Sequence, residues 1–131
     1  MIGVDTNVLV RYLTLDDEDQ VARVDHLIHD TVERDEPLHL DSIVLCETAW
    51  VLRSVYNRSP EEVADALERV VDTRQFSIED RDSMRRALGT FRAAAGDFAD
   101  YLIGERNRWA GCWTTMTFDR NLEGSLLFEG L

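Results

Sequence analysis

Apolar residues recur along this chain at the spacing of amphipathic helices, and polar residues fill the positions between them. The clearest case is Glu18–Arg34, where Val21, Val24, Ile28 and Val32 share one face. Polar caps and apolar stripes predict five further helices. One begins at Val8, one runs from Asp41 or Ser42 to about Tyr56, and one begins at Ser59. The last two cover Arg81–Phe91 and Asp97–Trp109.

Short β-compatible runs separate these helices. They are Met1–Val4, Pro37–Asp41, Gln75–Ile78 and Cys112–Thr117. Short strands that alternate with longer helices are typical of an α/β fold with a mainly parallel sheet. No repeat or linker divides the 131 residues, so we expect one domain over residues 1–131.

The charge balance narrows the functions that this chain can have. It carries 26 acidic residues against 14 basic ones, for a net charge of −12, and every basic residue is Arg. The excess of acid argues against binding of bulk phosphate or of an anionic membrane. The absence of Lys excludes Walker-A loops, Schiff-base enzymes and protein kinases. With no apolar run near about 18 residues and no leader-like start, we expect a cytoplasmic protein without membrane association.

A few acidic residues stand in positions that are unusual for surface charges. Asp5 and Asp119 each follow a predicted strand, where sites of parallel sheets form. Glu47 lies within an apolar helical stretch, where a buried charge is expensive without a partner. Asp97 and Asp100 are three residues apart and share a helix face. Taken singly, each of these acids is more simply explained as a helix cap or as the partner of an Arg.

Taken together, these acids point to a cation. Like charges that converge destabilise a fold unless something neutralises them, and the chain has no Lys to do so. Carboxylate oxygens suit a hard divalent ion such as Mg²⁺ or Mn²⁺. An ion held in this way activates water and stabilises charge on a phosphoryl oxygen.

Four segments that contain these acids resemble the motifs of PIN-domain proteins, in particular the VapC toxins of toxin–antitoxin pairs. The segments are Val4–Leu13, Glu47–Leu52, Asp97–Ile103 and Gly111–Asp119. Each motif alone is weak, but the four occur in order and span essentially the whole chain. The resemblance implies a three-layer α/β/α domain with a mainly parallel central sheet.

The resemblance also implies an activity and a site. It implies a Mg²⁺- or Mn²⁺-dependent endoribonuclease that cuts structured RNA such as tRNA or rRNA and leaves a 5′-phosphate. Its catalytic acids would be Asp5, Glu47, Asp100 and Asp119, with the metal on Asp5, Asp97, Asp100 and Asp119. Polar support would come from Thr6, Asn7, Thr115 and Thr117. The implied partners are a second copy of the chain and a VapB-like antitoxin that occludes the site.

Two other functions remain open at this point. A catalytically silent PIN-fold module that binds RNA or protein is disfavoured because all four acids are present. A phosphoacceptor receiver domain needs an acid pair after the first strand and a Lys after the last, and this chain has neither.

Several further residues have both a structural and a functional interpretation. His26 and His29 are interpreted as surface residues and not as a zinc pair, and Trp50 as a core residue. The bulky Tyr101 stands where PIN relatives often have Ala, so it is a candidate for altering the groove. Trp109 and Trp113 fit base stacking, core or dimer contacts. Four arginines fit either an RNA-phosphate grip or solvated surface: Arg11, Arg106, Arg108 and Arg120.

Overall fold

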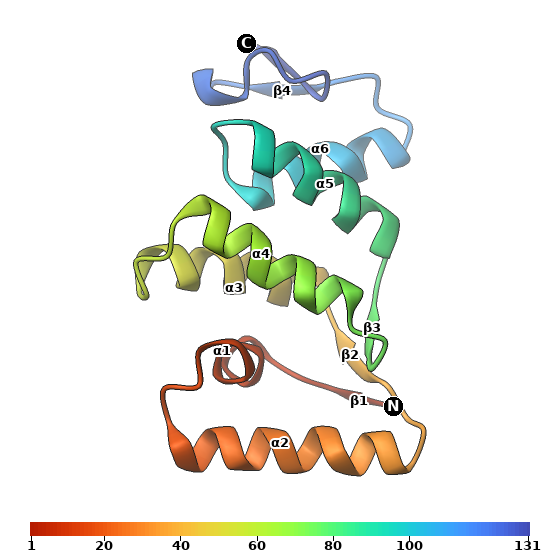
Figure 1. Cartoon of the computed structure of the whole chain (residues 1–131). Helices are drawn as coiled ribbons and strands as arrows, with labels where there is room; N and C mark the ends of the chain where they lie inside the picture. The colour runs from red at the N-terminus through yellow and green to blue at the C-terminus, as the bar shows by residue number, and fades with distance from the viewer. The chain divides into compact units, whose positions relative to one another are not determined.

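The chain forms two units, Met1–Glu79 and Asp80–Leu131, in a computed structural model that describes residues 1–131. Figure 1 colours the first unit from red to green and the second from green to blue. Each unit has its own helices and its own parallel strands. The two units are therefore described one after the other.

The first unit holds three strands and four helices. In chain order they are β1 (Ile2–Gly3), α1 (Thr6–Thr14), α2 (Glu18–Glu33), β2 (Leu38–Leu40), α3 (Ser42–Ser54), α4 (Pro60–Asp72) and β3 (Phe76–Ile78). The strands pair in the order β1-β2-β3, all parallel, with Ile2 opposite Leu38 and Leu38 opposite Phe76. Helix α1 packs against both α2 and α3, as Figure 1 shows.

Short polar side chains start the helices of this unit. Asp5, Asp17 and Asp41 cap α1, α2 and α3 by accepting a backbone N–H of the first turn. At α4, the Ser59 hydroxyl accepts the Glu62 N–H and the Glu62 carboxylate accepts the Ser59 N–H, each at 3.1 Å. These bonds satisfy amide groups that have no partner within the helix, which is why the capping residues predict the helix starts so well.

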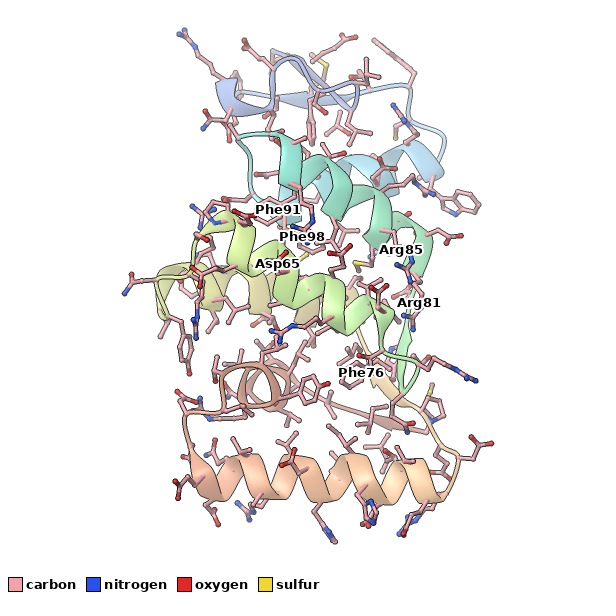
Figure 2. The ribbon with its side chains drawn as sticks, in the orientation of Figure 1. Asp65, Phe76, Arg81, Arg85, Phe91 and Phe98 are labelled. Atoms are coloured by element: carbon pink, nitrogen blue, oxygen red, sulfur yellow. The ribbon has the colours of Figure 1, made fainter.

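The core of the first unit gathers around β2 and the inner faces of α3 and α4. Leu40 and Val63 are fully buried, and Leu45 is almost so. The Phe76 ring, labelled in Figure 2, meets the edge of Tyr12 from α1 with ring centroids 5.4 Å apart. This contact ties the sheet to α1, the helix that carries Asp5 at its start.

The second unit contains two helices, a two-stranded sheet and a 3-10 turn. Its elements are α5 (Arg81–Ala93), α6 (Phe98–Trp109), β4 (Thr115–Thr117), the turn η1 (Arg120–Leu122) and β5 (Phe128–Gly130). Helices α5 and α6 pack along each other, and the Phe91 and Phe98 rings meet with centroids 6.2 Å apart. Both residues are labelled in Figure 2. Strand β4 pairs in parallel with β5.

The α/β class and the parallel strands predicted from sequence are confirmed, and the predicted helices are all present. Three features differ or are new: the last predicted strand begins at Thr115, and the sequence patterns did not predict η1 or β5. No helix is long and apolar enough to cross a membrane. That residues 1–131 form a single domain stays a prediction.

Candidate functional site

Asp5 lies at the point where β1 gives way to α1. It is exposed, and its Oδ1 accepts the Val8 N–H at 3.1 Å, so it caps the helix. The capping bond uses one lone pair and holds the carboxylate in a fixed orientation. The remaining lone pairs stay available to a cation or a water molecule.

A groove between α1 and α2 begins at Asp5. Its volume is about 370 Å³, and Asp5, Asn7 and Arg23 line it together with the apolar Val24 and Leu27. Thr6, the first residue of α1, is half-buried, and Asn7 is exposed. Of the first motif's predicted residues, Asp5 and Asn7 therefore share one groove.

Glu47 differs from the sequence-based expectation of a costly buried charge. It is exposed on α3, because Leu45, Thr48 and Leu52 take the buried face of that helix. Trp50, one turn further on, is 66% exposed, so its assignment to the core is wrong. Although the residues around Glu47 are mostly apolar, the helix has one buried face and one face exposed to solvent, and Glu47 lies on the exposed face.

The second unit brings three of the predicted acids together. Asp97 caps α6, and its N–H donates to Asp100 Oδ2 at 3.2 Å. Asp100 is half-buried, and desolvation raises the pKa of its carboxyl. The negative charges of Asp97 and Asp119 raise this pKa further, against the opposing effect of the Asp97 N–H bond. A raised carboxyl pKa among like charges marks a place where a cation is favoured.

Both the side chain and the backbone N–H of Asp119 make hydrogen bonds to neighbouring residues. Its Oδ1 accepts the Asn121 N–H at 2.9 Å, which caps η1, and its N–H donates to Thr117 Oγ1 at 3.0 Å. Thr117 thus holds the backbone of Asp119, and its role as a polar support of a metal site stays a prediction.

Thr115 is anchored to a residue that the sequence analysis missed. Asn107 Nδ2 on α6 donates to Thr115 Oγ1 at 3.0 Å, and the Asn107 carbonyl accepts the Cys112 N–H at 2.9 Å. Asn107 therefore fixes β4, the strand that ends just before Asp119, against α6. The only signal in the sequence is a polar residue of low helix propensity near the end of α6.

Arg11 is engaged in a network of its own. Its guanidinium donates to Asp16 Oδ1 at 3.0 Å and to Tyr56 Oη at 2.9 Å, and it also contacts Gln20. The Tyr56 hydroxyl donates to Asp16 Oδ2 at 2.7 Å. Hydrogen bonds from Tyr56 and Thr14, together with the charge of Arg11, lower the pKa of Asp16. Arg11 thus joins α1 to the segment after α3, which does not favour the role of a phosphate grip.

The other residues with two interpretations are now placed. His26 and His29 are exposed and face Asp30 and Glu33 at 3.5 and 3.2 Å, which confirms the surface interpretation. Tyr101 is fully buried, so it projects into the core of its unit. No three side chains among His, Cys, Asp and Glu form a complete metal site.

Comparison with known proteins adds two findings. The family model described as PIN domain matches residues 2–123, which spans both units. A relative from Aquifex aeolicus (strain VF5), described as a VapC ribonuclease, is 22% identical over 120 residues, which cover 92% of this chain and 88% of the relative.

Proposed function

Because the chain belongs to the PIN domain family, we propose that it is a Mg²⁺- or Mn²⁺-dependent endoribonuclease of the VapC type. The observation that supports the proposal is that Asp100 accepts the Asp97 N–H and that the negative charges of Asp97 and Asp119 act on the Asp100 carboxyl in the second unit. The relative described as a VapC ribonuclease, matched over nearly its full length, supports the same activity.

The donor set fits a hard divalent ion. Carboxylate oxygens are the ligands that Mg²⁺ and Mn²⁺ prefer, and the pKa of Asp100 is raised by desolvation and by the negative charges of Asp97 and Asp119. We assign Asp5, Asp97, Asp100 and Asp119 as the residues that hold the ion. When bound, the ion supplies positive charge to the scissile phosphate and lowers the pKa of water.

The side chains of this chain then have distinct tasks. Hydrolysis needs a water that attacks phosphorus in line while the bond to O3′ breaks, which leaves a 5′-phosphate and a 3′-hydroxyl. We assign Asp5, Glu47, Asp100 and Asp119 as catalytic acids, and one carboxylate accepts the proton of the attacking water. The capping bonds at Asp5 and Asp119 hold these groups before substrate arrives.

The polar neighbours keep the acids in place. Thr117 accepts the Asp119 N–H, and Thr115 ties β4 to α6. Thr6 and Asn7 adjoin Asp5 at the start of α1. We assign all four to positioning of the carboxylates, the phosphate or water.

The proposal extends to the setting of the enzyme. The substrate is structured RNA such as tRNA or rRNA, cleaved by a cytoplasmic homodimer that a VapB-like antitoxin inhibits. The match of one family model across both units supports a single PIN domain over residues 1–131.

The decisive experiment compares two matched aspartates. Asp5 and Asp17 both cap helices in the first unit, and Asn caps as well as Asp, so Asp5→Asn and Asp17→Asn both preserve the fold. We expect Asp5→Asn to abolish Mn²⁺-dependent cleavage of RNA and Asp17→Asn to retain it, in assays that map the RNA ends. Full activity of rigorously purified Asp5→Asn protein would refute the mechanism and favour a silent binding module.

A further inference from the structure

The negative charge of this chain is distributed unevenly between its units. Residues 1–79 carry eighteen acidic residues and seven arginines, whereas residues 80–131 carry eight acidic residues and seven arginines. The second unit is therefore close to neutral, and three of its acids are the group proposed to hold a cation. The barrier to RNA binding that the net charge implies belongs mainly to the first unit.

The second unit also exposes two tryptophans. Trp109, the last residue of α6, is 80% exposed, and Trp113, before β4, is 82% exposed. The turn between them is tight, because the Gly111 N–H donates to the Arg108 carbonyl and the Cys112 N–H to the Asn107 carbonyl. Two indole rings this exposed at one hydrogen-bonded turn make this region a candidate interaction surface.

Arginine and apolar side chains accompany these rings. Arg108, Trp113 and Leu126 line one shallow hollow between α6 and the segment before β5. Arg108 is exposed, and its guanidinium donates to the Leu126 carbonyl at 3.3 Å, which leaves further N–H groups available. An arginine that lines the same hollow as an exposed indole ring is a combination that binds a single nucleic-acid strand.

The surface is connected to the acids by two elements. Helix α6 begins next to Asp97 and ends at Trp109, and β4 leads from Trp113 back towards Asp119. At about 1.5 Å per residue, the two ends of α6 lie roughly 16 Å apart. One bound strand has to cover this distance to touch both the acids and the indole rings.

We propose that Trp109, Trp113 and Arg108 form a platform on which unpaired bases of the RNA substrate stack, at the end of α6 opposite the proposed cleavage site. This inference rests on the proposed function and adds the residues of this chain that hold unpaired bases. Bases in a duplex are already stacked and leave no face for an indole ring.

The test measures binding apart from cleavage. Variants are made in the Asp5→Asn background with Mn²⁺ present, and anisotropy follows a fluorescein-labelled unstructured RNA and a duplex of the same sequence. We expect Trp109→Ala and Trp113→Ala each to weaken binding of the single strand by about 5- to 150-fold, and to leave duplex binding unchanged. Arg108→Ala should reduce the salt dependence of binding.

Trp50→Ala is the matched control, because Trp50 is 66% exposed and lies in the acidic first unit. It should bind both RNAs like the parent. Single-strand affinity that is unchanged in both platform variants would overturn the inference, as would a loss shown equally by Trp50→Ala. A change in sedimentation at unchanged RNA affinity would assign the surface to a second copy. If the wild type does not cleave RNA at all, the proposed function fails, whatever the platform binds.

Discussion

Tyr101→Phe probes the contact that holds the acid-bearing loop of the second unit. Tyr101 is fully buried, its Oη accepts the Gly96 N–H at 2.8 Å, and its ring packs on Phe128 with centroids 6.4 Å apart. Gly96 directly precedes Asp97, and a Cβ added to it would collide with the Leu122 side chain. Tyr101 thus connects the residue before the cap of α6 to β5.

The magnitude follows from what the substitution removes. Phe keeps the ring contact with Phe128 and opens no cavity of methyl size, so the packing cost is small. The buried Gly96 N–H loses its acceptor, and an orphaned buried donor costs about 1–3 kcal/mol. For a chain of this length, 1 kcal/mol corresponds to about 3–4 °C in melting temperature, so we expect a drop of about 3–12 °C.

Urea denaturation measures this free energy directly. We expect a lower midpoint with an unchanged slope, because the change affects stability and not the surface exposed on unfolding. A loss of stability below about 0.5 kcal/mol would refute the reasoning, since it would mean that water or another group satisfies the Gly96 N–H.

Three further predictions can be measured with the same methods. Gly96→Ala should destabilise the protein by about 1–3 kcal/mol, because the added Cβ would lie 2.8 Å from Tyr101 Oη. Gly89→Ala should instead stabilise it by about 0.5–1 kcal/mol, because Gly89 is exposed in a helix and its added Cβ would meet nothing within 4 Å. A change of the same sign for both variants in urea denaturation would contradict this. Asp100→Asn should raise or preserve the melting temperature of the metal-free protein, because the raised pKa of Asp100 means that its negative charge costs stability. The same variant should lose the stabilisation that Mn²⁺ gives to the wild type. A large drop in the melting temperature would identify Asp100 as a structural cap instead. The hydrogen bond from Tyr56 lowers the pKa of Asp16, so the ionised carboxylate stabilises the fold at pH above 3.8, and this stability is lost as the pH falls through the lowered pKa. The urea midpoints of the wild type and Tyr56→Phe should therefore converge in acid. A constant difference between them across this range would exclude the linkage.

Local signals in the sequence determined the secondary structure and the identity of the candidate acids. Helix α4 begins where Ser59, Pro60 and Glu62 predict it, because its cap is made by residues within one turn. The stripe of valines predicted α2 for the same reason: helical spacing is a property of neighbouring residues. Asp5 and Asp119 followed from their places after strands, which the structure confirms.

The tertiary structure alone decided which faces are buried and which side chains meet. Trp50 and Glu47 lie in an apolar stretch of sequence, yet both are exposed. Their burial depends on which elements pack against α3 and not on the hydrophobicity of their neighbours in the sequence. The pairing of β4 with β5 and the bond from Asn107 to Thr115 join residues that no local pattern links. The raised pKa of Asp100 also needs the fold: Asp119 is nineteen residues away in sequence, and only packing brings its charge close enough to act.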